Sequence, residues 1–388
     1  MRIKRILATI KALFLYPKIS LALSRKRKLY FFFPYWSFGG AERVHIDIMQ
    51  LFKEQKPICF VTMHSINSGF RKEMEAVAEV INLGRWGEKR TYRAHLLKKL
   101  AKSINKQSKP IIFGWCSGFM YDLIPHLAPH VKIIDLTHNF TENITGIEWY
   151  SLPCIPRIDK RIAVSKSILQ QFRDLYQINN IDPKYLERIE VIQNKIPFEP
   201  ISITEKNYSG NLTVLFVARN SEEKRAHIFI EVAKLCYDQN YPINFEMIGD
   251  FNDYKDVVSP NLKIIGAIHN KNILNEYYKK AHILLLTSIR ESWGLVIFEG
   301  MNYGVVTIST NVGELSDYIS VGKENGILID NLEDDAHLAS LFFEQVVSMH
   351  NDRLKLNQFS IDAYNTVKQL SDGCRFSSSY KTLIDNYS

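Results

Sequence analysis

Cysteine is scarce in this 388-residue chain, and its five cysteines lie far apart without any Cys-x-x-Cys pair. Neither a disulfide framework nor a zinc site is therefore indicated, and we expect a protein of a reducing cytoplasm. No apolar run near the N-terminus approaches the roughly 20 residues that a membrane-spanning helix needs. No Asp-x-Asp motif follows a predicted strand, where its carboxylates would hold a divalent metal. We therefore predict no metal site and no cofactor.

The bulk composition is that of a soluble globular protein, with 46% hydrophobic and 23% charged residues. A chain of this length exceeds what one hydrophobic core usually supports, which favours two domains. Lys and Arg outnumber Asp and Glu by 49 to 41. That bias suits a polyanion, an anionic membrane or a phosphorylated small molecule, and it also suits a basic surface kept for solubility.

Residues 1–28 mix nine Lys and Arg residues with apolar ones. A signal peptide is not favoured, because Lys11 interrupts the apolar region and no small-residue cleavage site follows. Two interpretations remain, a basic amphipathic segment on an anionic leaflet and a solvated extension. We favour peripheral contact with the inner face of the cytoplasmic membrane.

Short apolar runs rich in β-branched and aromatic residues alternate with segments of helical periodicity, which is typical of βα units around parallel sheets. The predicted strands are Leu29–Phe33, Ile58–Met63, Ile111–Trp115, Ile133–Thr137, Arg161–Val164, Val214–Ala218, Phe245–Ile248, Leu262–Ile265, Ile283–Thr287, Val305–Ser309 and Gly326–Ile329. The predicted helices are Ala41–Lys53, Tyr92–Ser103, Ala226–Gln239, Leu274–Ala281 and His337–Met349. The same α/β pattern thus occurs twice, which predicts two Rossmann-like, doubly wound parallel-sheet domains.

A polar stretch rich in Pro, Asn, Ser and Gly separates the two series of strands and predicts a linker. The expected organisation is a basic segment 1–28, a first domain 29–197, a linker 198–211, a second domain 212–370 and a C-terminal helical segment 371–388 that packs back on the first domain.

The sharpest local motif is Glu291-Ser-Trp-Gly-Leu-Val-Ile-Phe-Glu299, a strand-end loop that enters a helix near Gly294, with Ser292 as its expected N-cap. Unpaired amides at a helix start attract anions, so Gly294 and Leu295 could receive a diphosphate. Eight helical steps would place the two carboxylates about 12 Å apart, one at each end of such a ligand. Two glutamates at this spacing are otherwise solvated surface charges.

Two cations follow the first strand of the second series. Arg219 stands at the strand's carboxyl end, and Lys224 follows in a loop that opens a helix. Ligands of open α/β sheets bind at those strand ends, where cations could hold both phosphates and offset the negative charge of a departing diphosphate. The alternative is a charge pair at a helix entry.

The first half carries weaker signals. Gly39 and Gly40 come directly after the first strand and open a helix, so their amides could approach a ligand, although a full G-x-G-x-x-G is lacking and a plain tight turn would fit. His138 ends a predicted strand at the same edge, where an imidazole could bind a sugar hydroxyl or serve only packing.

Taken together, these motifs resemble the GT-B glycosyltransferases, specifically glycosyltransferase family 4. The second half carries Val217-Ala218-Arg219 with Glu223-Lys224, Met247-Ile248-Gly249-Asp250, Thr287-Ser288-x-x-Glu291 through Glu299-Gly300-Met301, Gly313-Glu314-Leu315 and Glu324-Asn325-Gly326. The first half carries Gly39-Gly40-Ala41-Glu42, Thr137-His138, Ala163-Val164-Ser165 and Val191-Ile192-Gln193-Asn194.

The resemblance implies two domains facing a cleft and assigns a role to each motif. Glu291 would contact the transferred sugar and Glu299 the ribose, Arg219 and Lys224 would bind the diphosphate, Gly40 would lie against the phosphates, and His138 would sit near the donor sugar and acceptor. Three positions depart from the family pattern: Ala218 replaces a glycine, Asn139 replaces an aspartate after His138, and the domain junction reads Asn194-Lys195-Ile196-Pro197. The last two affect acceptor geometry and the hinge.

The implied activity is sugar transfer from a nucleotide-diphosphate donor with retained anomeric configuration and without a metal, in lipopolysaccharide or capsule synthesis. No acceptor-side carboxylate is an evident nucleophile, so front-face attack is favoured over double displacement. Three alternatives stay open. The basic charge suggests a nucleic-acid binder, but aromatics such as Phe31–Phe33 fall inside a predicted strand, as core residues rather than a stacking platform, and we expect no nucleic acid. The others are an inactive scaffold subunit of the same fold and a nucleotide-sugar 2-epimerase.

Overall fold

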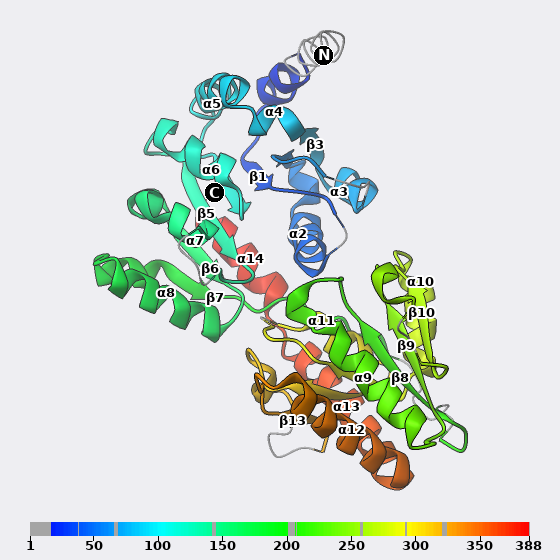
Figure 1. Ribbon diagram of the computed structural model, residues 1–388. Coiled ribbons are helices and arrows are strands. Elements are labelled where there is room, and N and C mark those ends of the chain that lie inside the picture. The colour runs from blue at the N-terminus through cyan, green and yellow to red at the C-terminus, as the bar shows by residue number, and fades with distance from the viewer. Residues whose placement is uncertain are drawn as a thin grey trace. The chain divides into compact units, whose positions relative to one another are not determined.

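A computed structural model describes residues 17–37, 39–65, 69–141, 145–200, 206, 208–256, 259–291, 293–319 and 324–387. The predicted membrane segment 1–28 therefore lies mostly outside the described residues. The chain divides into two compact units, the first made of Met1–Lys195 with Arg375–Ser388 and the second of Ile196–Cys374. Figure 1 shows that each unit contains its own sheet with helices packed around it.

The first unit is built on a seven-stranded, all-parallel sheet of order β3-β2-β1-β4-β5-β6-β7. Its strands are β1 (Leu29–Phe33), β2 (Ile58–Val61), β3 (Glu79–Asn82), β4 (Ile111–Trp115), β5 (Lys132–Thr137), β6 (Lys160–Ala163) and β7 (Ile189–Val191). Its helices are α2 (Gly40–Leu51), α3 (Arg71–Val77), α4 (Gly84–Glu88), α5 (Arg90–Ile104), α6 (Gly118–Leu123), α7 (Ile147–Tyr150), α8 (Lys166–Ile178) and α14 (Phe376–Asp385). Residues 17–24 are also helical.

The central strands of this sheet are buried on both faces, which explains their continuous apolar sequences. Every residue of β1 is buried, and β2 is buried throughout. The two edge strands, β3 and β7, were not predicted from the sequence. Both are short and only partly buried, so neither has the uninterrupted apolar run by which the other strands were recognised.

The second unit is built on a six-stranded, all-parallel sheet of order β10-β9-β8-β11-β12-β13. Its strands are β8 (Leu212–Val217), β9 (Ile243–Ile248), β10 (Leu262–Gly266), β11 (Ile283–Leu286), β12 (Val306–Thr310) and β13 (Gly326–Ile329). Its α-helices are α9 (Ala226–Asp238), α10 (Lys271–Lys280), α11 (Leu295–Met301), α12 (Asp335–Asn351) and α13 (Arg353–Asp372). The predicted strands and helices of this half agree with these bounds to within a few residues.

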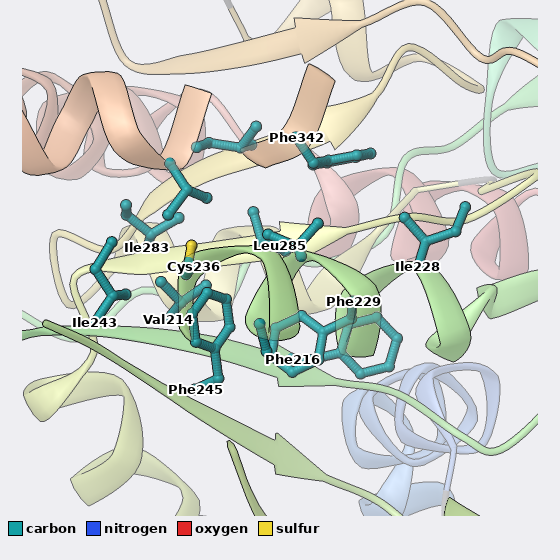
Figure 2. Packing of buried hydrophobic residues seen from close by; sticks show 14 of the residues in the cluster. Val214, Phe216, Ile228, Phe229, Cys236, Ile243, Phe245, Ile283, Leu285 and Phe342 are labelled. Atoms are coloured by element: carbon teal, nitrogen blue, oxygen red, sulfur yellow. The ribbon is translucent and has the colours of Figure 1, made fainter. Parts of the chain in front are cut away.

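One hydrophobic core of the second unit lies between the sheet and helices α9 and α12. Phe216 and Phe245 from the strands meet Phe229 of α9, with ring centroids 5.0 and 5.5 Å apart, and Phe342 of α12 lies in the same cluster (Figure 2). Such packed aromatic side chains are the largest contributors to core stability. They pack α9 against the central strands β8 and β9 of the sheet.

Both sheets reverse their strand order at the same relative place. In the first unit the neighbours β1 and β4 flank the reversal, and in the second β8 and β11 do so. Ligands of doubly wound sheets bind outside the carboxyl ends of the two strands at this switch point. The motifs after β1, β8 and β11 therefore lie where this architecture places a binding site.

Of the predicted linker 198–211, the described residues contact the second unit. The Glu199 amide donates to Oδ1 of Asn302, and the Tyr208 ring meets His282 edge-on at 5.5 Å. At the other end of the chain, α14 belongs to the first unit, where its Tyr380 ring lies 6.0 Å from Phe113 of β4.

Candidate functional site

The loops after β8 and β11 bring two of the predicted site residues into direct contact. Nζ of Lys224 lies 2.6 Å from Oε1 of Glu291, and the Ser288 hydroxyl donates to the same carboxylate oxygen at 2.8 Å. Both charged side chains are mostly shielded from solvent, at 15% and 13% exposure. Residues 67 positions apart in the chain thus form one short, shielded ion pair at the switch point.

Arg219, the other predicted cation, is placed differently. It follows β8, but its side chain is 74% exposed and its nearest carboxylate is Glu223, 4.0 Å away. Glu223 also receives Arg290, from the loop after β11, at 3.5 Å. Arg219 is therefore a solvent-facing cation at the rim of the loops, whereas Lys224 is held inside them.

Arg225, which was not predicted as a site residue, holds these loops together. Its backbone is left-handed (φ 45°), an uncommon conformation for a residue other than glycine. Its buried guanidinium donates to the carbonyls of Thr287 at 2.7 Å and Leu332 at 3.0 Å, and to Oδ1 of Asn331. The Thr287 hydroxyl returns a 2.8 Å bond to the Lys224 carbonyl. These bonds fix the loop that carries Lys224 against the loop that leads to Glu291.

Helix α11 begins at Leu295, and Gly294 precedes it with a left-handed backbone (φ 59°). A Cβ at Gly294 would lie 3.0 Å from Cδ1 of Ile297, so both the conformation and the space favour glycine. The expected N-cap Ser292 lies outside the described residues, and the N-cap position is Gly294 itself. The expectation of eight helical steps between Glu291 and Glu299 was wrong, because Glu291 precedes the helix, which begins at Leu295.

Glu299 projects from the last half of α11 and is partly buried. The Tyr278 hydroxyl of α10 donates to its Oε2 at 3.1 Å. Burial raises the pKa of Tyr278 well above its usual value, so the phenol remains a donor at any ordinary pH. This bond orients the Glu299 carboxylate, which can accept further hydrogen bonds on its lone pairs.

In the first unit, Gly39 and Gly40 lie at the start of α2 after β1. A Cβ at Gly39 would lie 2.3 Å from Oε2 of Glu42, so the Glu42 carboxylate is folded back over the helix start. Carboxylates favour this place because the helix dipole is positive there. A phosphate was predicted at these glycines from the sequence, and that prediction did not consider the Glu42 carboxylate beside them.

His138 follows β5 and is buried, with its Nε2 atom 3.1 Å from Nε2 of His45 on α2. Burial lowers the pKa of His138 to about 3, so its imidazole is neutral at physiological pH. It can therefore donate or accept a hydrogen bond, but it carries no positive charge. His45 was not singled out from the sequence, because a histidine within a helical apolar pattern is ordinarily a core residue.

Within the described part of the chain, no cluster of three or more His, Cys, Asp or Glu side chains is arranged to hold a metal. No helix there combines the length and apolar character required to span a bilayer.

Residues 198–360 match the family "Glycosyl transferases group 1". A Klebsiella pneumoniae protein described as an uncharacterized 41.2 kDa protein in the cps region is 27% identical over 258 residues, 65% of this chain and 66% of that protein. An uncharacterized glycosyltransferase of Methanocaldococcus jannaschii is 31% identical over 178 residues, 44% of this chain and 45% of that protein. The chain thus matches just under two thirds and under half of the length of these two relatives.

Among solved structures, HepE of Anabaena in complex with UDP-glucose superposes with a TM-score of 0.69. The alignment covers 92% of this chain and 99% of that one at 15% identity, a similarity of fold alone. The chain therefore has the GT-B fold of two Rossmann-like parallel-sheet domains, and its second unit matches the group 1 glycosyl transferases.

Proposed function

We propose that this chain is a retaining, metal-independent glycosyltransferase of family 4 that moves a sugar from a nucleotide-diphosphate donor to a glycan or lipid-linked glycan. The observation that carries the proposal is the shielded Lys224–Glu291 pair, which lies at the switch point of the second sheet and within the family match. It puts a cation suited to a diphosphate beside a carboxylate suited to a sugar hydroxyl.

Each group has a defined part in this reaction. The bond between the anomeric carbon and the diphosphate oxygen breaks with its electron pair on the diphosphate, and Lys224 and Arg219 stabilise the negative charge that develops. The acceptor oxygen bonds to the same face of the anomeric carbon and passes its proton to a leaving phosphate oxygen. Glu291 binds a hydroxyl of the sugar, Glu299 binds the ribose, and the amides of Gly294 and Leu295 bind phosphate oxygens.

Two alternatives on the same fold make different predictions. A scaffold subunit would bind a partner without turning over a donor, and a 2-epimerase would change the donor sugar with no acceptor present. The presence of Glu291, Glu299, Arg219 and Lys224 together favours an enzyme over a scaffold. Product analysis with and without acceptor separates the transferase from the epimerase.

The donor is tested by screening UDP-, GDP- and dTDP-sugars for stabilisation of the full chain. A donor that binds should raise the free energy of unfolding by about 2.7 kcal/mol when its concentration is 100 times its Kd. The Glu299→Gln variant should need a higher donor concentration for the same stabilisation. The matched control is Glu231→Gln on α9, an exposed helix position whose contact is with Lys234.

NMR of the product made from that donor should show the donor's anomeric configuration, with the rate unchanged in EDTA. An inverted product or loss of rate in EDTA would reject the mechanism.

The acceptor is proposed to be a growing surface polysaccharide or lipopolysaccharide. The support is the similarity to a protein of the Klebsiella pneumoniae cps region. Such acceptors are built on lipid carriers, so the enzyme would work at the inner face of the cytoplasmic membrane.

We propose that the first unit reaches this membrane through α5 together with the basic N-terminal segment. From Lys89 to Lys109 the sequence holds eight Lys and Arg residues and no Asp or Glu. The buried face of α5, including Leu97 and Leu100, packs in one cluster with Ile19 and Leu23 of the N-terminal helix. Lys98 and Lys102 are on the exposed face. The exposed lysines Lys98, Lys102 and Lys106 thus come from a stretch that holds no acidic residue, as binding to an anionic bilayer surface favours.

Neutralising Lys98, Lys102 and Lys106 to Gln should weaken binding to phosphatidylglycerol vesicles by about 100-fold, because each cation near such a surface contributes about 1 kcal/mol. Cosedimentation at low salt measures the partition coefficient. The matched control neutralises three exposed lysines of the second unit, Lys234, Lys279 and Lys355, and should bind nearly as the parent does. Equal loss in both triple variants, or equal binding to neutral vesicles, would contradict the assignment.

A further inference from the structure

Two buried histidines of the first unit form a hydrogen-bonded pair whose geometry is set by aromatic neighbours. His45 is fully buried, and its ring stacks flat on Phe33 with centroids 3.9 Å apart and an angle of 4°. Trp115 closes a second side at 4.8 Å. The His45 ring is therefore held in one orientation, with Nε2 directed at Nε2 of His138.

The pair must share a single proton between the two facing nitrogens. Burial lowers the pKa of both rings, and for His45 the nearby His138 lowers it further. Two neutral imidazoles carry one ring proton each. A hydrogen bond between the two Nε2 atoms, 3.1 Å apart, requires that one of them holds a proton and the other does not. Only two combinations of tautomers satisfy this condition.

The surroundings of His45 distinguish the two combinations. Its Nδ1 atom is buried and has no hydrogen-bond partner. If His138 donated, the His45 proton would have to sit on Nδ1, where a buried N–H would be left without an acceptor. Orphaned N–H donors are rarer in proteins than under-satisfied acceptors. The favourable combination is donation from Nε2–H of His45 to a bare Nε2 of His138.

We propose that His45 is a positioning residue that fixes His138 in the tautomer with its proton on Nδ1, so that His138 serves as a hydrogen-bond donor to a ligand oxygen. The nature of that oxygen, on a sugar or its phosphate, rests on the proposed function. His138 follows β5, next to β4 at the switch point of the first sheet, where a ligand is expected. In this state His138 is not a general base, since its facing nitrogen already accepts from His45.

The tautomer is measured directly by long-range ¹⁵N–¹H correlation on the full chain labelled at its histidines, with His45→Gln and His138→Gln spectra assigning the two rings. The expected pattern is a protonated Nδ1 and an unprotonated Nε2 for His138, and the reverse for His45. In the His45→Phe variant, which retains the stack on Phe33, His138 should lose its preference for the Nδ1–H tautomer. A wild-type His138 protonated on Nε2, or one unchanged by His45→Phe, overturns the proposal.

Kinetics provide a second readout that general loss of packing would not reproduce. His45→Phe should lower kcat about tenfold, as expected for a net hydrogen bond of ordinary strength, with the donor KM little changed. His45→Gln keeps an N–H donor near the position of Nε2 and should restore most of kcat. If Gln and Phe variants are equally impaired, the positioning role is wrong. The spectra need neither donor nor acceptor, so they judge the tautomer even if no glycosyl transfer is found, which would refute the proposed function alone.

Discussion

Replacing Lys224 with Ala is expected to lower kcat/KM for sugar transfer by about 10² to 10³-fold, the usual result of removing one preorganised group that stabilises charge in a transition state. Lys224 is held 2.6 Å from Glu291 and is shielded by the loops that Arg225 clamps together. The interaction of a shielded cation with a phosphate is screened less than it would be in water, so it is stronger. The measurement is steady-state kinetics with the donor found in the nucleotide-sugar screen.

The control for this variant is Arg290→Ala. Arg290 lies in the neighbouring loop and pairs with Glu223, but its side chain is 55% exposed, so its loss should change kcat/KM by only a few-fold. Lys224→Arg keeps the charge and should retain more activity than Lys224→Ala. Equal effects of Arg290→Ala and Lys224→Ala would mean that only the overall charge of the region matters.

Replacing Arg161 with Leu should lower the free energy of unfolding of the first unit by about 3–5 kcal/mol, because it leaves a carboxylate buried without its cation. Arg161 and Asp135 are almost completely buried and 2.8 Å apart. The same guanidinium donates to Tyr176 and Ser151 and lies 4.5 Å over the Phe172 ring. Denaturant titration followed by tryptophan fluorescence reports this unit, since four of the five tryptophans precede residue 196.

Two further variants test the cause of that loss. Arg71→Ala breaks an exposed ion pair with Glu75 and should cost less than about 1 kcal/mol. Combining Arg161→Leu with Asp135→Leu removes both buried charges and should recover much of the stability. If the double variant is less stable than Arg161→Leu alone, loss of the hydrogen bond that Asp135 accepts from Tyr121 outweighs the relief of the unpaired charge.

The sheets could be predicted because their central strands are buried on both faces. Runs such as Leu29–Phe33 and Ile283–Leu286 are apolar without interruption, and that feature is visible in sequence. The edges β3 and β7 lack this feature and were missed. The order of strands, and hence the switch point, followed only from the architecture that repeated βα units favour.

The candidate site was predicted in its residue types more than in its contacts. Lys224 and Glu291 were both chosen, but their direct pairing is a contact across 67 positions that no local pattern encodes. Arg225 was missed because an arginine in a left-handed turn has no sequence signature. The His45–His138 pair was missed for a similar reason, since His45 lies on α2 and His138 follows β5, two separate elements of the first unit.

Helix α14 has a consequence for how the chain is made. It completes the first unit, with Tyr380 buried and its ring 6.0 Å from Phe113, yet it leaves the ribosome after every residue of the second unit. Domains generally fold during synthesis in the order in which they emerge. Here the second unit, Ile196–Cys374, is synthesised completely before the first unit is. The apolar surface around Phe113 therefore stays uncovered while about 180 residues are translated.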